Sequence, residues 1–424
     1  MGWHQVHPML SSRSRLGFSY YPDDRHYTLA ESEAWLPILT GLEAGWLVLR
    51  AEPERAVPEA FLKAVLDAGV EPVVHIPARI GSLSEADVTP LLTSYARWGL
   101  RYVVLFDRPN LRARWEASEW SRGGLVERFL DRSLPLLRAA QGAGLAPIFP
   151  PLEPGGDYWD TAFLEAALSS LVRRGEQALL EHLHLGLYAW TYDRPLTWGA
   201  GGPLAWPETR PYFTPQGSQD QRGFRIFDWY AGIARRALEH DLPMLVLGGG
   251  AVPPRGNSGL LGDSFGEQNA EIARLLLAGD VPEAVMNFAF SNLTADPSSA
   301  EAHAAWFDAP DAPRPWVESY RRAVRAASKT ARPAPVRPIA HYLLLPDSGL
   351  SELAGLWPAL FPFAAEGRCA VGFSAREARA AERVTLVGGP DLISTEMETD
   401  LRQAGCRVAR IFMPASDATL RQEE

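Results

Sequence analysis

Short apolar runs alternate with longer stretches of helical period along most of the chain. Eight runs are strand candidates: Leu16–Tyr21, Gly45–Arg50, Pro72–Ile76, Tyr102–Phe106, Ala146–Phe149, Leu183–Tyr188, Met244–Leu247 and Ala284–Phe290. Most are rich in Val, Ile, Leu and Phe and lack a regular polar alternation, which is typical of strands that are covered on both faces. Strands that alternate with helices predict right-handed βαβ units and a parallel sheet.

The stretches between these runs carry the signals of helix ends. Thr28 with Glu31, and Ser264 with Glu267, have the spacing of a capping box. Helices are expected near Glu59–Ala68, Leu125–Ala140, Thr161–Arg174, Phe224–His240 and Asn269–Ala278. Eight strand–helix units fit a (β/α)8 barrel with insertions, since such barrels typically span ~250 residues. An open doubly wound sheet would place a Gly-rich loop after the first strand. This chain has Tyr-Pro-Asp-Asp there, so the α/β fold predicted is the barrel.

The chain beyond residue 327 has an organisation of its own. We assign residues 1–327 to the barrel, Ser328–Pro338 to a Pro-rich linker, 339–412 to a small three-layer α/β domain and 413–424 to a disordered tail. The strands of the small domain are expected near His341–Leu345, Ala370–Phe373, Val384–Val387 and Val408–Phe412, and its helices near Glu352–Leu360, Ala375–Ala381 and Thr395–Ala404.

The charge balance excludes several classes of partner. A formal net charge of −10 and a pI near 5.5 argue against a nucleic-acid binder, which normally has a basic face. They also argue against polybasic attachment to a membrane, and no window approaches the ~18 apolar residues that can span a bilayer. Residues 1–15 lack the apolar core of a secretory signal. This predicts a cytoplasmic protein, or an extracytoplasmic one if a signal was left out of this sequence.

Cysteine and histidine usage predicts neither a metal site nor a cofactor. Cys369 and Cys406 are the only cysteines; we expect two buried free thiols, with a disulfide between them as the alternative. The nine histidines show no HExxH or similar ligand spacing. His182 and His184 stand two residues apart at the start of the sixth strand, where a structural role is expected.

Aromatic and polar side chains follow the ends of several predicted strands. In a (β/α)8 barrel the functional groups gather at these carboxyl ends. Flat aromatic faces with hydrogen-bonding groups between them suit a saccharide or glycoconjugate, although the same rings could merely cover the barrel mouth. The candidate ligand-binding residues are Tyr20, Tyr21, Asp107, Arg108, Asn110, Trp190 and Tyr192. The insert Thr197–Gln221, rich in Gly, Pro and Trp, is expected to lie over the mouth as a lid.

Several segments resemble the retaining glycoside hydrolases of the large (β/α)8 clan. The fourth strand and its loop, YVVLFDRPNLRARW, resemble the Asn-Glu-Pro motif that supplies the acid/base glutamate of this family. The segment PMLVLGGGAVP stands where the family's seventh strand ends in the nucleophilic glutamate, and a loop and the helix GEQNAEIARLL follow it. The closing stretch AAWFDAPDAPRPWVESYRRAV resembles the family's final loop and helix. The resemblance covers about residues 16–327 and implies the same barrel.

The resemblance also implies that both catalytic glutamates are replaced. The acid/base glutamate falls on Arg108 and the nucleophile on Gly248, while the Asn of the motif falls on Asp107. Retention of configuration needs two carboxyls about 5 to 5.5 Å apart. An arginine stays protonated near neutral pH and glycine has no side chain, so the usual mechanism would be lost.

Other interpretations of these positions stay open at the level of sequence. Arg108 could brace the barrel mouth by pairing with Asp107 or Glu153, or its guanidinium could bind an acidic sugar. Gly248–Gly250 could let a ligand approach the backbone, but a tight turn is expected. Glu153 and Asp193 are the candidates for relocated catalytic acids among the carboxylates near strand ends.

The segment RVTLVGGPDLISTEMETDLRQAGCRVARI resembles one unit of a bacterial cell-wall-binding repeat. Its Gly388 and Gly389 could bind an anion before a helix, or form a plain turn. Taken together, the sequence predicts a catalytically degenerate, saccharide-binding relative of glycoside hydrolases, with no identified protein partner. Two alternatives remain: an active hydrolase that uses relocated carboxylates, and a scaffold that uses the barrel only for protein contacts.

Overall fold

The computed structural model describes residues 14–253, 262–330, 339–346, 369–389 and 392–411. The chain divides into two compact units, one up to Ser328 and one from Lys329. Helix α11 (Pro315–Thr330) continues through the first three residues expected in the linker. The rest of that linker, the helix expected at Glu352–Leu360 and the expected tail lie outside the described residues.

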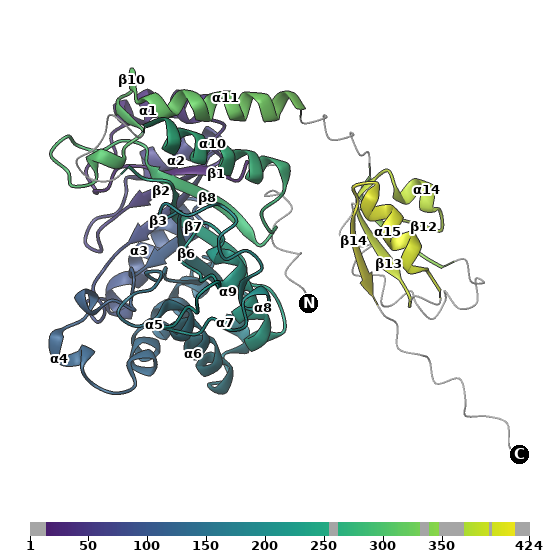
Figure 1. Cartoon of the computed structure of the whole chain (residues 1–424), viewed down its shortest axis with the longest axis horizontal. Coiled ribbons are helices and arrows are strands. Elements are labelled where there is room, and N and C mark those ends of the chain that lie inside the picture. The colour runs from purple at the N-terminus through teal and green to yellow at the C-terminus, as the bar shows by residue number, and fades with distance from the viewer. Residues whose placement is uncertain (1–13, 254–261, 331–338, 347–368, 390–391, 412–424) are drawn as a thin grey trace, which may run out of the picture. The chain divides into compact units, whose positions relative to one another are not determined.

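The first unit is a nearly closed barrel of eight parallel strands (Figure 1). The eight strands predicted from the sequence are confirmed: β1 Leu16–Ser19, β2 Trp46–Arg50, β3 Glu71–Ile76, β4 Tyr102–Leu105, β5 Ile148–Phe149, β6 His184–Trp190, β7 Met244–Gly250 and β8 Val285–Asn292. Each hydrogen-bonds in parallel to its neighbour in the order β4-β3-β2-β1-β8-β7-β6-β5. A single bridge between Tyr102 and Ala146 joins β4 to β5. The strand β5 is short because Pro147 and Pro150 beside it have no N–H to donate.

Helices lie around this ring of strands (Figure 1). They are α1 Leu29–Gly41, α2 Glu59–Asp67, α3 Glu85–Arg97, α5 Leu125–Gly142, α6 Asp160–Arg173, α9 Ile226–Leu238, α10 Gly262–Ala278 and α11, with the short turns η3 Arg112–Arg114, α4 Ala117–Trp120, α7 Gln177–Leu180, α8 Gly202–Ala205 and η4 Ala302–Ala304. A two-stranded hairpin of β9 (Phe307–Ala309) and β10 (Ala312–Pro313) precedes α11. No helix in the described ranges is long and apolar enough to cross a membrane.

The two predicted capping boxes have different outcomes. At α1 the box is present, because the Thr28 hydroxyl accepts from the Glu31 N–H and the Glu31 carboxylate accepts from the Thr28 N–H. At α10 the expectation is wrong, because the helix begins at Gly262 and already contains Ser264.

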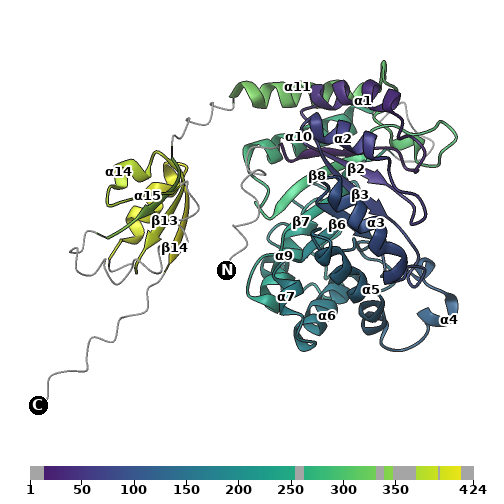
Figure 2. The same ribbon diagram turned by 180° about the vertical axis from the view of Figure 1, so that it is seen from behind.

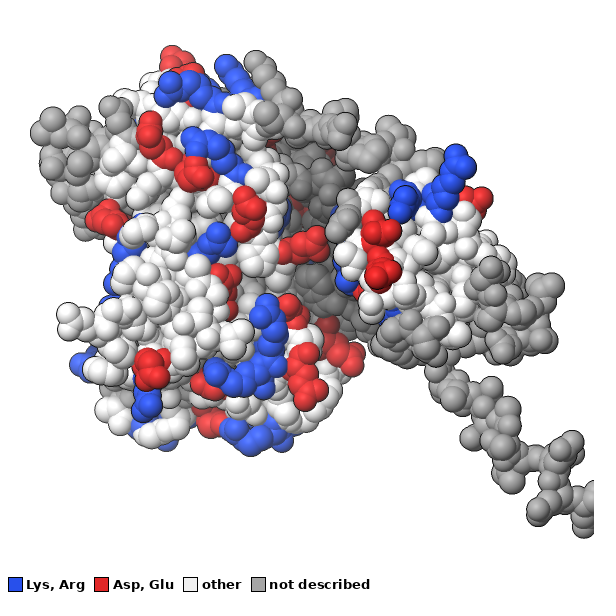
Figure 3. All heavy atoms as spheres, turned by 45° about the vertical axis from the view of Figure 1, so that its right-hand side comes forward, with Lys and Arg blue, Asp and Glu red and all other residues white. Residues whose placement is uncertain are grey.

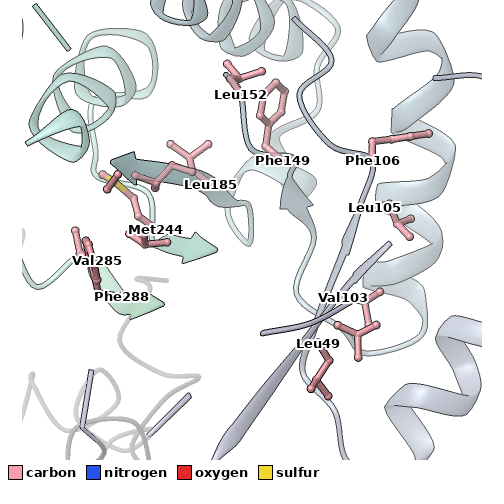
Figure 4. Close-up of a cluster of buried hydrophobic side chains, with 14 of the residues drawn as sticks. Leu49, Val103, Leu105, Phe106, Phe149, Leu152, Leu185, Met244, Val285 and Phe288 are labelled. Carbon is pink, nitrogen blue, oxygen red and sulfur yellow. The ribbon is translucent and has the colours of Figure 1, made fainter. Parts of the chain in front are cut away.

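The alternation of side chains along each strand builds two cores. On β2, Trp46 and Val48 point into the barrel, whereas Leu47 and Leu49 point outward to the helices. The outer core is continuous around the ring, and Figure 4 shows part of it, with Phe149 and Leu152 beside the strands and helices. On the outside of the barrel, acidic and basic side chains lie beside one another over the face shown in Figure 3.

The second unit is a small parallel sheet with its own core. Its order is β12 (Cys369–Gly372), β11 (Ile339–Leu344), β13 (Ala381–Val387) and β14 (Arg407–Ile411), so its four predicted strands are all present. The described helices α14 (Ala375–Ala378) and α15 (Thr395–Gln403) pack against this sheet and against each other (Figure 2). Neither Cys369 nor Cys406 is part of a disulfide; Cys406 is buried as expected, whereas Cys369 is only partly buried.

Candidate functional site

A cavity of about 660 Å³ opens at the carboxyl ends of the barrel strands. Every strand, or the loop that follows it, contributes to its lining. The lining includes Tyr21, Arg50, His75, Asp107, Arg108, Arg114, Glu153, Tyr188, Trp190, Tyr192, Asp193, Gly248, Asn292, Glu301 and His303. This is the end of the barrel where (β/α)8 proteins carry their sites.

Asp107 is the centre of a polar network on one wall. The Tyr188 hydroxyl donates a 2.8 Å hydrogen bond to Asp107 Oδ1, and Arg114 forms an ion pair with Oδ2. The Arg108 Nε lies 3.7 Å from Asp107 Oδ1 and 3.1 Å from Glu153 Oε2. One guanidinium therefore lies between two carboxylates, and both acids serve as its counter-ions.

The backbone conformation of Arg108, as well as its ion pairs, fixes the position of its side chain. Phe106 and Arg108 have φ angles of +68° and +49°, a left-handed conformation that costs non-glycine residues about 1–2 kcal/mol each. The Arg108 N–H donates to the Pro151 carbonyl at 2.8 Å, and its guanidinium lies 4.5 Å from the centre of the Tyr188 ring. Burial lowers the pKa of Arg108, but Tyr188, Asp107 and Glu153 raise it on balance. The side chain is a permanent cation in this wall.

Glu153 is the partly buried carboxyl that faces Arg108. Burial raises the pKa of Glu153, Arg108 offsets part of this increase, and the nearby charge of Asp107 raises the pKa further. His75, buried beside them, has its pKa lowered by burial, against the raising effect of Asp107. Its Nε2 lies 3.0 Å from the Phe106 carbonyl oxygen.

Trp190 covers the position to which the resemblance assigns the nucleophile. Strands β6 and β7 pair in parallel, with Tyr188 opposite Gly248 and Trp190 opposite Gly250. A Cβ atom added at Gly248 would lie 3.0 Å from Cζ2 of Trp190 and 3.3 Å from Cδ1 of Tyr188. The rings of Tyr188 and Trp190 are nearly parallel, with centroids 6.2 Å apart. Aromatic surface fills the space that a longer side chain at residue 248 would enter.

The structure brings five of the seven expected ligand-binding residues to the cavity: Tyr21, Asp107, Arg108, Trp190 and Tyr192. Tyr21 stacks on His26, with ring centroids 3.7 Å apart, and the side chain of Tyr192 is 42% exposed. Asp193 also lines the cavity, and both Tyr192 and Asp193 have left-handed backbone angles.

Tyr20 and Asn110 do not line the cavity, so the structure places them elsewhere than the sequence indicates. Tyr20 follows Leu16 and Phe18 on the outer face of β1 and is fully buried against Tyr27 and Phe61, because alternate residues of a strand point to opposite faces. Asn110 is fully buried as well. Its amide donates to the carbonyls of Glu153 and Tyr158 and accepts from the Glu153 N–H, and it thereby ties two loops together.

Two further expectations are corrected. Gly248–Gly250 do not form a turn but complete strand β7. The reason for glycine is close packing, since a Cβ at Gly249 would lie 2.7 Å from Cζ of Phe288. The insert Thr197–Gln221 contributes no residue to the cavity lining. It packs against α9 instead, where Trp229 Nε1 donates to the Gly199 carbonyl, so the expected lid position is wrong.

Some residues of the cavity were not among the sequence candidates. Tyr188 and Arg50 lie at or near the ends of β6 and β2, and the strand-end rule alone would have found them. Arg114 and His303 belong to loops whose path the sequence does not reveal. His184, at the start of β6, is buried, and its Nδ1 lies 2.9 Å from the His182 carbonyl oxygen.

Comparisons with known proteins give structural similarity only. No family model and no curated protein matches the chain. A monomeric β-xylosidase from Caulobacter crescentus CB15 aligns with a TM-score of 0.49 and 11% identity over 73% of this chain and 67% of the other. A β-glucuronidase from Bacteroides uniformis aligns with a TM-score of 0.48 and 13% identity over 78% of this chain and 37% of its own. For a GH5 xyloglucanase from Bacteroides ovatus, the values are 0.44 and 9%, with 78% of each chain covered. At these values the function must be argued from the cavity itself.

Proposed function

We propose that the barrel is glycoside-hydrolase-like, that it binds a saccharide in the mouth cavity, and that it does not cleave it by the two-glutamate retaining mechanism. The cavity volume lies within the range of about 300–1,000 Å³ that small-molecule sites occupy. Tyr21, Trp190 and Tyr192 offer ring faces for the C–H surface of a sugar. Asn292, Glu301 and His303 offer partners for its hydroxyls.

The observation that carries this proposal is the pairing of Arg108 with two acids. A retaining pair needs one carboxyl that cycles a proton and a second that attacks the sugar. Here the position of the first is an arginine that binds both Asp107 and Glu153, and the position of the second is a glycine beneath Trp190. Pairing with Arg108 opposes proton uptake by Glu153, although burial raises the pKa of this carboxyl on balance.

One observation favours the alternative of an active hydrolase. Burial raises the pKa of Glu153, and a general acid needs the protonated form at working pH. Glu153 with Asp193 is therefore the pair to test. The scaffold alternative has less support, because it would be favoured by a mouth plugged by Thr197–Gln221, and no residue of that insert lines the cavity. We place the cell-wall-binding-repeat-like segment in an accessory role, as a surface for attachment or for a partner.

Binding is tested by matched aromatic variants. Tyr192 and Phe213 are both exposed rings, at 42% and 61%, and only Tyr192 belongs to the cavity lining. In calorimetry with xylose, glucose and glucuronic acid and their β-linked disaccharides, we expect at least one ligand to bind. For that ligand, Tyr192→Ala should weaken affinity at least about tenfold, or about 1.4 kcal/mol, and Phe213→Ala should leave it unchanged.

Catalysis is tested on the same sugars as 4-nitrophenyl glycosides. We expect no turnover by the wild type above that of the buffer. Turnover that survives Arg108→Ala but is lost in Glu153→Gln or Asp193→Asn would establish the active hydrolase instead. An absence of both turnover and binding would leave the scaffold alternative.

A further inference from the structure

Asp23, His26 and Asp296 lie together at the rim of the barrel mouth. Asp23 and His26 belong to the loop between β1 and α1, and Asp296 follows β8, the neighbour of β1 in the sheet. One potential ligand atom of each residue lies within 4.8 Å of the other two. Asp23 and His26 are three residues apart, whereas Asp296 is distant in sequence, so no local spacing motif includes all three.

The imidazole of His26 is fixed in orientation by two neighbours. Its Nδ1 lies 2.8 Å from Glu31 Oε1, and its ring stacks on Tyr21. The carboxylate of Glu31 can only accept, so Nδ1 carries a hydrogen. The other nitrogen, Nε2, is buried and has no hydrogen-bond partner among the described residues.

Nε2 of His26 faces two carboxylate oxygens. It lies 3.5 Å from Asp23 Oδ2 and 3.7 Å from Asp296 Oδ2. These separations exceed the usual hydrogen-bond range. They are close to the ~3.4 Å that separates tetrahedral ligands bound at about 2.0–2.1 Å from a shared ion. When the hydrogen is on Nδ1 alone, Nε2 directs a lone pair at two carboxylates, and a cation between the three atoms would remove this repulsion.

We propose that Asp23, His26 and Asp296 bind a divalent transition-metal ion, Zn²⁺ in preference to Mg²⁺ or Ca²⁺, with Glu31 as the positioning residue for His26. One imidazole nitrogen with two carboxylate oxygens suits Zn²⁺, whereas Mg²⁺ and Ca²⁺ favour oxygen ligands alone. Three protein ligands leave a position for water. The ion would join the β1 and β8 loops next to Tyr21, a wall of the cavity.

The test is titration of the full chain, freed of metal by a chelator, with ZnCl₂ and then with MgCl₂ in a calorimeter. We expect one equivalent of Zn²⁺ to bind, with a rise in melting temperature, and Mg²⁺ to bind at least about 100-fold more weakly. His26→Gln and Asp296→Asn should each lower the affinity for Zn²⁺ by about 100-fold or more. Glu31→Gln should lower it by about 10- to 100-fold, while glutamine still satisfies the capping box of α1.

His240→Gln is the matched control. His240 is an exposed histidine of the same barrel, with Nδ1 2.9 Å from the Leu238 carbonyl oxygen, and its substitution should leave Zn²⁺ binding unchanged. A wild type that takes up no Zn²⁺ would overturn the proposal, and the cluster would then be an ion pair held by a proton on Nε2. Unchanged Zn²⁺ affinity in Asp296→Asn, a change at a half-exposed side chain, would overturn it as well.

Discussion

At the scale of single residues, Arg108 and Trp190 determine what the cavity can do. Arg108 pairs with both Asp107 and Glu153, Arg114 is a second counter-ion of Asp107, and Trp190 lies over Gly248. Each side chain also makes contacts that fix it in place, through the Tyr188 ring in both cases. Under the proposed function, a cation and an aromatic face stand where the resemblance assigns the two glutamates of a retaining glycosidase.

This arrangement makes Gly248→Ala a sensitive change. The added methyl would meet Trp190 and Tyr188 at 3.0–3.3 Å, so the rings must move. We expect a loss of about 1–3 kcal/mol in the free energy of unfolding and weaker saccharide binding. Gly41→Ala is the control, because Gly41 is the last residue of α1 and a Cβ there meets nothing within 4 Å, so its stability should change little. Equal stability of the two variants in urea unfolding would contradict the account of Trp190.

The residues of the site were only partly predictable from the sequence. The strand-end rule places Tyr21, Asp107 and Trp190 at the mouth because β-strand ends can be located from apolar runs. It fails for Tyr20 and Asn110, because the rule does not say which face of a strand a residue takes, or that a buried amide joins two loops. Ion pairing of Arg108 was one of two open interpretations, and its contacts with Asp107 and Glu153 are those of that interpretation; binding of an acidic sugar stays a prediction.

At the scale of elements, the carboxylate of Asp220 is a central contact of the insert Thr197–Gln221 between β6 and α9. Asp220 forms ion pairs with Arg194 and Arg222 and accepts from Trp198 Nε1 at 3.1 Å. Burial opposes ionisation, but the bonds from Arg222, Trp198 and Arg194 lower the pKa of Asp220 to about 2. The stabilisation is therefore complete above the ordinary value of about 3.8 and is lost as pH falls from about 4 to about 2.

Asp220→Asn should consequently release the insert at neutral pH. Removing one partner of a buried ion pair costs about 3 kcal/mol or more, which corresponds to about 100-fold faster amide exchange over residues 197–219. Hydrogen–deuterium exchange measures this directly. The control is Asp241→Asn, which removes an exposed pair with Arg235 and should change exchange little. Unchanged protection of the insert in Asp220→Asn would show that its packing on α9, and not the carboxylate, holds it.

Most of the elements follow from the apolar pattern, and the exceptions have local causes. Eight strands and the cap at Thr28 were predicted because period and capping chemistry are local properties. The length of β7 was not predicted, because a run of three glycines in a sequence indicates a turn. The close packing of Phe288 and Ala189 against Gly249, which requires glycine within the strand, is a tertiary contact. The position of the insert depends on Trp229 and Asp220, contacts that no periodicity encodes.

At the scale of the whole molecule, the chain contains separate hydrophobic cores. Among the described residues, the clusters around the barrel strands reach as far as Val324, and the third cluster begins at Ile339. Because each unit buries its own apolar side chains, we expect two transitions in calorimetry of the full chain instead of one. The two transitions can then be assigned by their response to pH.

His341 provides the means of assignment. It is buried in the second unit, with Nε2 2.9 Å from Thr385 Oγ1, and burial, with Arg383, lowers its pKa from 6.5 to about 4. Between these values the unfolded chain binds the proton and the folded chain does not. Stability is therefore full above pH 6.5 and falls as pH decreases, by about 2 kcal/mol at pH 5. The transition of the second unit should move to lower temperature between pH 7.5 and pH 5, and His341→Gln should remove this contribution. If the same transition shifts equally in wild type and variant, another group in that unit carries the pH dependence.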